Sequence, residues 1–204
     1  MERFVKEVSN VLPYDREQYL DFFDEDVDLP NPTPRWFGVS LQLASIQNQK
    51  LSVSTNEIIE HSIDLLLLAL KTIVSMLDKS RFWIVNHDDK DMEWFPVGKN
   101  GEMVPELKAF FQQNNVPNSY RGSLVFSKDD LLLIGRDLVS YPYRFSYKNL
   151  DISHSELQFV IKITGHLTID LLSTNQTLIH QIMNDGSLST FVKINYRSRW
   201  SDNK

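Results

Sequence analysis

A histidine and an aspartate near the C-terminal end of the chain have the types and the spacing for acid–base chemistry. His166 and Asp170 are four residues apart, which places them on one face of either a strand or a helix. A carboxylate that accepts a hydrogen bond from an imidazole orients the ring as a general base or as a metal ligand. His154 joins the pair only if its strand lies beside theirs in a sheet. Two residues do not make an active site, and a structural hydrogen bond explains the same spacing, so both stay catalytic candidates only.

A second histidine lies in an acidic turn. His87 is followed by Asp88, Asp89 and Asp91, and carboxylates with one imidazole are ligands that a divalent cation accepts. Aspartate is also common in polar turns because its side chain hydrogen-bonds the local backbone. The turn interpretation needs no ligand, so we assign no metal site here.

Several classes of enzyme and metalloprotein are excluded by what the sequence lacks. There is no cysteine, which excludes disulfide scaffolds, thiolate metal sites and a cysteine nucleophile. The seven glycines form no phosphate-binding loop, and neither a nucleophile elbow nor an H-E-x-x-H pattern occurs. Asp24, Asp26 and Asp28 resemble the start of a calcium loop, but Leu29 and Arg35 stand where that loop needs glycine and glutamate. We expect no cofactor and no bound metal.

The net charge of −6 is concentrated at the N-terminus. Residues 1–31 hold nine acidic and three basic residues, which sum to −6, so the remaining residues are neutral in total. An acidic segment repels nucleic acid and anionic membranes and attracts basic partners. We therefore expect another protein as the partner, with a basic protein as the complementary type, and no nucleic acid. A solvated surface segment is the alternative interpretation.

The hydrophobic pattern predicts a cytoplasmic protein without a membrane partner. The longest apolar run, residues 65–70, is far shorter than the roughly 20 residues that span a bilayer. The first residues are charged and lack the apolar stretch of a signal peptide. The absence of cysteine is compatible with the cytosol as well.

Three prolines mark the clearest domain boundary. Pro30, Pro32 and Pro34 each lack an amide N–H and restrict the preceding residue, which stops regular structure. We divide the chain into an acidic N-terminal arm with a Pro-rich boundary, residues 1–34, and a single α+β domain, residues 35–204. The arm has too many aromatic residues for a solvated tail, so we expect it to dock on the body or on a partner.

Charged residues at the two ends of the chain complement one another. The acidic candidates for binding are Asp21, Asp24 and Asp26 of the arm. The basic candidates are Lys193, Arg197 and Arg199, which share one face of the expected last strand. Three roles are open for this basic stripe: it receives the arm, binds an anion, or faces water and discourages edge pairing. Trp36, shortly after the prolines, is the candidate aromatic contact of an interface.

Hydrophobic periodicity defines the expected elements. Strands are expected at residues 39–43, 141–147 and 191–200, and hairpins at 81–86 with 93–97 and at 124–126 with 131–134. Helices are expected at residues 13–23, 57–78, 105–114 and 174–185, the last closed by Gly186. The first hairpin would pair Trp83 with Trp94 across its strands.

Residues 155–173 allow two structures. Apolar residues alternate with polar ones on both sides of Gly165 and His166, which indicates two strands joined by a turn. Ser153 and Glu156 form a capping-box pattern, which indicates a helix instead. The β-branched content and the central glycine favour the two strands.

These elements predict an α+β fold. It consists of a mainly antiparallel sheet built from hairpins, with one long buried helix and one or two shorter helices packed on it. Since no catalytic motif emerges, we expect a non-enzymatic protein-binding module, such as an inhibitor, an immunity-type or a regulatory protein that acts through a protein–protein interface. The alternative is a small hydrolase or metal-assisted enzyme that uses a His/Asp site, and a ligand-binding or structural role is a third.

Overall fold

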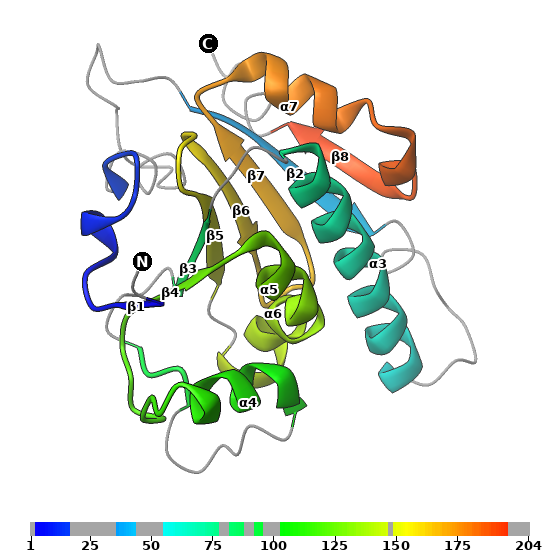
Figure 1. Ribbon diagram of the computed structural model, residues 1–204. Coiled ribbons are helices and arrows are strands. Elements are labelled where there is room, and N and C mark those ends of the chain that lie inside the picture. Colours follow the sequence, from blue (N-terminus) through cyan, green and yellow to red (C-terminus); the bar gives the residue numbers. More distant parts are fainter. Residues whose placement is uncertain are drawn as a thin grey trace, which may run out of the picture.

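An antiparallel sheet of eight strands is the framework of the fold (Figure 1). The computed structural model describes residues 3–16, 36–43, 55–77, 82–87, 92–95, 103–146 and 149–195. The strands are β1 (Phe4–Val5), β2 (Phe37–Leu43), β3 (Trp83–His87), β4 (Ser123–Phe126), β5 (Leu150–His154), β6 (Phe159–Ile163), β7 (Ile169–Ser173) and β8 (Phe191–Asn195). Their order in the sheet is β1-β4-β3-β5-β6-β7-β2-β8. All neighbouring pairs are antiparallel, so the predicted α+β fold is confirmed.

Five α-helices accompany the sheet within the described ranges. They are α3 (Thr55–Met76), α4 (Pro105–Gln113), α5 (Lys128–Leu133), α6 (Gly135–Tyr141) and α7 (Gln176–Met183). Pro142–Ser146 continues α6 as a π-helical turn, and short 3-10 turns occur at Val8–Asn10 and Gly186–Leu188. Figure 1 shows α3, α5, α6 and α7 on the viewer's side of the sheet. None of the helices in these ranges has the length and apolar character to cross a membrane.

The 22-residue helix α3 is the main packing element. Its fully buried side chains are Ile63, Leu66, Ala69, Leu70, Ile73 and Val74. This spacing of three or four residues places the apolar side chains on one helix face, which packs on the sheet. Burial of each large apolar side chain contributes about 1.5–3 kcal/mol. The predicted long buried helix is confirmed.

The sheet has two buried faces with different partners. Neighbouring strands align Val85, Ile152, Ile161, Leu171 and Val39 in one row. These residues share a hydrophobic core with buried side chains of α3, α4, α6 and α7, and we call this side the helix face. Because successive side chains of a strand alternate between faces, the residues between them point to the other side. There Val160 and Leu172 pack with Tyr14 and Trp36, so we call that side the N-terminal face.

Residues 155–173 hold the β6–β7 hairpin, so the two-strand interpretation is confirmed and the helical alternative is wrong. Thr164 organises the turn between the strands. Its Oγ1 accepts a hydrogen bond of 3.2 Å from the N–H of His166 and lies 2.8 Å from Thr168 Oγ1. Leu167 has a positive φ of 57°, which residues other than glycine uncommonly adopt. Side-chain hydrogen bonds therefore hold a turn that backbone preference alone would not favour.

The hairpin predicted from residues 81–86 and 93–97 is wrong. β3 lies between β4 and β5, so both of its edges are already paired within the sheet. Trp94 lies outside the strands, whereas Trp83 contacts the ring of His154, with centroids 5.2 Å apart. The predicted cross-strand pair of tryptophans is therefore absent. The polar turn suggested a partner close in sequence, but β3 finds its partners far along the chain.

The hairpin predicted from residues 124–126 and 131–134 is wrong in its second strand. Residues 124–126 belong to β4, which pairs with β1 and β3 instead. Residues 131–133 lie in α5, and Ser127 caps the start of that helix by accepting a 3.2 Å hydrogen bond from the N–H of Asp130. The serine cap and the acidic first turn favour a helix over a strand here.

Two further predictions differ at helix ends. Residues 141–147 were expected as a strand, but residues 141–146 form the end of α6 and the π-helical turn, with Pro142 at φ −58° and ψ −42°. The fixed φ of proline is compatible with a helix, so it does not break this one. The helix predicted at residues 174–185 is α7, which ends at Met183 with Asn184 as its C-cap. Gly186 begins the following 3-10 turn and does not cap α7.

The remaining elements are confirmed where the structure describes them. The strand at 39–43 is β2, the helix at 105–114 is α4, and the first half of the strand at 191–200 is β8. Residues 196–200 lie outside the described residues, as do most of the helix predicted at 13–23 and the boundary placed at residue 34.

The N-terminal residues form one edge of the sheet. β1 pairs with β4, with Val5 opposite Ser123, and Phe4 packs against the core of the helix face. Gly122 directly precedes β4. A Cβ atom at this position would lie 2.7 Å from the carbonyl oxygen of Val5 and closer still to the Tyr120 hydroxyl. Only glycine lets β1 approach β4 this closely.

Replacement of Gly122 by alanine should weaken the attachment of β1. The added methyl group meets the backbone of Val5, so β1 has to shift, and overpacking of this kind typically costs about 1–3 kcal/mol. Urea unfolding followed by tryptophan fluorescence measures the loss in the free energy of unfolding. Gly186→Ala is the matched control, because its Cβ would meet nothing within 4 Å. Equal losses in the two variants would contradict this view of β1.

Candidate functional site

Five polar residues form a continuous row across the N-terminal face. They are Asn86, Asp151, Lys162, Asp170 and Ser40, on β3, β5, β6, β7 and β2 in that order. The register of the sheet aligns each residue with the next, and every side chain in the row is buried. Asp151 and Lys162 are only 1% and 5% exposed. Charged side chains are almost never buried unless they are paired. We call these five residues the polar row.

The charges of the polar row alternate in sign, and an arginine from the N-terminal part extends the alternation. Lys162 Nζ lies 3.0 Å from Asp151 Oδ1, and Arg16 Nη2 lies 3.8 Å from Asp151 Oδ2. Asp170 is the register neighbour of Lys162 on its other side. Arg16 Nη2 also donates a hydrogen bond of 2.7 Å to the carbonyl of His87. Two cations and two carboxylates therefore sum to zero formal charge.

This arrangement is better suited to fixing a structure than to transferring protons. The attraction within a buried ion pair roughly offsets the lost hydration, but removal of one member leaves an uncompensated charge. Opposite charges on adjacent strands also disfavour registers that would bring like charges together. Through its ion pair with Asp151, Arg16 connects the N-terminal segment, residues 3–16, to the polar row. The polar row thus determines where that segment lies on the sheet.

An aromatic pair lies beside the polar row. The Tyr14 hydroxyl is 2.8 Å from Ser153 Oγ, and burial raises the pKa of Tyr14 above its ordinary range. The rings of Tyr14 and Trp36 meet edge to face, with centroids 5.1 Å apart, and Trp36 is only 3% exposed. Trp36, the candidate interface residue, therefore packs within the chain. Its contact with Tyr14 brings together two positions that are separated by residues 15–35.

The two catalytic candidates lie in different environments. Asp170 is buried in the polar row, whereas His166 is exposed in the turn between β6 and β7. The spacing argument fails because the turn at Gly165 takes His166 out of the regular strand. His154 lies on the helix face beside Trp83, opposite to the face of Asp170. It does not join Asp170 across the sheet.

The basic stripe is described only at Lys193. This residue lies on β8, and its Nζ donates a hydrogen bond to the carbonyl of Met183 at the C-terminal end of α7. A cation at this position complements the helix dipole, so the charge of Lys193 has a partner within the chain. The other binding candidates, Asp21, Asp24, Asp26, Arg197 and Arg199, lie outside the described residues.

His87, the histidine of the acidic turn, is buried on the helix face. Its Nε2 is 3.1 Å from the Tyr141 hydroxyl, which itself donates a hydrogen bond to the carbonyl of Trp94. Because the hydroxyl proton points to Trp94, His87 Nε2 is the donor toward Tyr141. The three aspartates that follow His87 lie outside the described residues. In the part of the chain that is described, no group of three or more His, Asp or Glu side chains could hold a metal ion.

Sequence reasoning misses Arg16, Asp151 and Lys162. A single polar residue between apolar ones in a strand ordinarily indicates a position that faces water. The available signal is the charge pattern of three strands, Leu-Asp-Ile at 150–152, Ile-Lys-Ile at 161–163 and Ile-Asp-Leu at 169–171. The central charges alternate from strand to strand, as the polar row requires.

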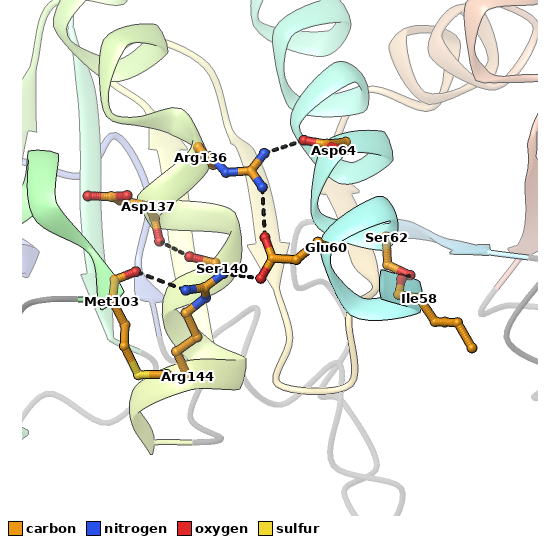
Figure 2. A network of polar contacts seen from close by, with 9 residues as sticks. All are labelled: Ile58, Glu60, Ser62, Asp64, Met103, Arg136, Asp137, Ser140 and Arg144. Atoms are coloured by element: carbon orange, nitrogen blue, oxygen red, sulfur yellow. Dashed lines mark hydrogen bonds and ion pairs between the residues drawn. The ribbon is translucent and has the colours of Figure 1, made fainter. Parts of the chain in front are cut away.

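A second charged cluster joins α3 to α6 (Figure 2). Arg136 pairs with Asp64 and with Glu60, the latter at 2.8 Å, and Arg144 lies 2.5 Å from the other oxygen of Glu60. Arg144 also donates to the carbonyl of Met103 at 3.3 Å. Asp64, Glu60 and Arg136 are exposed, and surface ion pairs contribute only about 0–1 kcal/mol each. We interpret this cluster as a set of ion pairs that holds α3 beside α6.

Asp137, which lies beside this cluster of ion pairs, is a buried carboxylate with a structural role. Its Oδ2 accepts a hydrogen bond of 2.8 Å from the N–H of Leu107 in the first turn of α4. Burial raises the pKa of Asp137, while hydrogen bonds from the backbone of Leu107 and Glu106 act in the opposite direction. The side chain thus ties the start of α4 to α6.

Comparison with protein-family models, curated proteins and solved structures gives no match. The polar row is the most deeply buried set of charges in the described part of the chain that is shared by several elements. It is therefore the candidate functional site of the described residues.

Replacement of Lys162 by methionine tests the polar row. Methionine keeps much of the side-chain volume but leaves the carboxylates around it without their ammonium group, and breaking a buried pair in this way costs about 3–5 kcal/mol. Urea unfolding provides the free energy. Lys71→Met on the exposed face of α3 is the matched control and should change stability by less than about 0.5 kcal/mol. A loss at Lys162 no larger than at Lys71 would rule out a structural role for the row.

Proposed function

We propose that this chain is a non-enzymatic protein-binding module that presents an acidic segment to a basic protein partner. The observation that carries the proposal is the contact between Tyr14 and Trp36, whose ring centroids are 5.1 Å apart. Residues 17–35, which we call the acidic segment, make up most of the chain between these two positions. The sequence of the segment holds six acidic residues and one basic residue. The described residues on either side of the acidic segment therefore lie at one place on the N-terminal face.

Anchoring at both ends favours binding. Arg16 is held by the His87 carbonyl and by Asp151, and Tyr14 is held by Ser153, directly before the acidic segment. A segment held at both ends has fewer conformations than a tail attached at one end. It loses less conformational entropy when a partner binds, so more of the interaction energy appears as affinity. This supports a binding role over that of a solvated spacer.

The charge of the acidic segment specifies the chemistry of the partner. Carboxylates form charge-assisted hydrogen bonds with arginine and lysine side chains. A concentrated negative charge also accelerates association with a basic protein at low salt. The charged groups of the polar row and Arg16 sum to zero, so the anchor does not neutralise the segment. An inhibitor, an immunity-type protein or a regulator of a basic target fits this description.

The alternative of a small hydrolase or metal-assisted enzyme has less support. It requires His166 and Asp170 to act on one substrate. The side chain of His166 is exposed in the β6–β7 turn, whereas Asp170 is buried in the polar row. The buried charges of the polar row also face one another, which suits a structural role.

Removing three of the six carboxylates of the acidic segment should weaken binding of the partner at least tenfold. The variant is Asp21→Asn with Asp24→Asn and Asp26→Asn, because these changes remove charge and keep side-chain size. The partner is first recovered from the native host by affinity purification with the full chain and identified by mass spectrometry. Titration calorimetry then measures the dissociation constant between about 50 and 300 mM salt, where screening increases. Binding by the native chain should weaken steadily as salt rises.

The matched control is Glu57→Gln with Glu106→Gln and Asp129→Asn. These acidic side chains are exposed on α3, α4 and α5, and the control changes net charge by the same amount. It should bind the partner like the native chain. If both triple variants bind equally well, or if salt has no effect, the acidic segment is not the binding surface.

A further inference from the structure

His154, at the end of β5, is a buried histidine that holds the turn after it. Its Nδ1 accepts hydrogen bonds from the N–H of Glu156 at 3.0 Å and from the N–H of Leu157 at 3.1 Å. Its ring packs edge to face against Trp83, with centroids 5.2 Å apart, and the side chain is enclosed by the protein. The two hydrogen bonds to Nδ1 thus hold the turn at residues 155–158, which connects β5 to β6.

The two hydrogen bonds define the protonation state of the ring. A ring nitrogen that accepts hydrogen bonds carries no proton, so the neutral ring of His154 has its proton on Nε2. Nε2 is buried and makes no hydrogen bond to the described residues, and the backbone of Leu77, after the end of α3, lies near the ring. A proton added to Nδ1 converts the acceptor into a donor. That N–H would then point at two backbone N–H groups, and both hydrogen bonds would be lost.

The surroundings of His154 disfavour the charged ring. Burial lowers the pKa of His154 below its ordinary value, while the Glu156 carboxylate and the Leu77 carbonyl raise it by less. Trp83 and Leu77, which face the ring from β3 and from the end of α3, carry no charge. Among the described residues, Glu156 is therefore the charged group that faces the ring. The ring is neutral in the closed turn at neutral pH.

We propose that His154 is an acid-sensitive latch, whose protonation opens the turn at residues 155–158 and loosens the connection between β5 and β6. In the open turn the ring meets water and has its ordinary pKa of about 6.5. Because the closed turn binds the proton less tightly than the open turn, acid shifts the equilibrium to the open state. The latch is fully effective above about pH 6.5. Its effect is lost as the pH falls toward the lower pKa of the closed state.

Opening of the turn changes the surface at this end of the sheet. Leu157 is already 42% exposed, and Trp83 is buried behind His154. The turn also contacts the segment before α7, because Thr174 N–H donates a hydrogen bond of 3.3 Å to the carbonyl of Gln158. Release of the turn therefore uncovers apolar side chains that the closed state hides. This change of the surface is independent of the acidic segment.

Amide hydrogen exchange of Glu156 and Leu157, measured by NMR on the full chain, tests the latch. Protection factors, which are corrected for the intrinsic effect of pH, should fall roughly tenfold between about pH 7.5 and 5.5. The reason is that, between about pH 6.5 and the lower pKa of the closed turn, each pH unit changes the opening equilibrium by about a factor of ten. In His154→Asn the side-chain oxygen still accepts hydrogen bonds but does not titrate, so protection should stay constant. His166→Asn, in the next turn, is the matched control and should respond like the native chain.

Two results would overturn the latch. One is protection of Glu156 and Leu157 that does not change with pH in the native chain, and the other is the same fall in His154→Asn. If His154→Asn does not fold, the ring ¹⁵N shifts of His154 in the native chain replace it. Protonation of the ring without a parallel fall in protection would then contradict the proposal, and a parallel fall would support it.

Discussion

A lysine buried at the centre of an antiparallel sheet has to be neutralised, and this requirement organises the N-terminal face. Lys162 on β6 lies between Asp151 on β5 and Asp170 on β7. A slip of either neighbouring strand by one residue would turn its aspartate to the helix face and remove a carboxylate from the buried ammonium group. The same register aligns the apolar residues that pack against α3. Charge on one face and packing on the other therefore specify one arrangement of the central strands.

The polar row also explains why the N-terminal segment belongs to the fold. Arg16 reaches the carbonyl of His87, and Tyr14 reaches Ser153, contacts that span 71 and 139 residues of sequence. Both contacts join the N-terminal segment to strands of the sheet. They therefore do not depend on the overall composition of that segment. Arg16, the last described residue before the acidic segment, is held in place for this reason. The proposed binding role depends on this link between a neutral buried anchor and a charged segment.

The sequence predicts the positions of helices and strands better than it predicts which strands pair with one another. The helix α3 and the β6–β7 hairpin follow from periodicity, because residues close in sequence define them. The predicted pairing of Trp83 with Trp94 fails because β3 pairs with strands that lie far away in the sequence. Lys162 resembles a residue that faces water until the register places an aspartate on each side of it. The spacing of His166 and Asp170 is informative only within one regular element, and a turn separates them.

A double-mutant cycle on Arg16 and Asp151 tests the link between the N-terminal segment and the polar row most directly. Arg16→Met, Asp151→Asn and the double variant are compared by their free energies of unfolding in urea. Both side chains are buried and close to each other, so their coupling energy should be roughly 1–3 kcal/mol. A coupling energy near zero would contradict the account, because Arg16 would then not be held by the polar row.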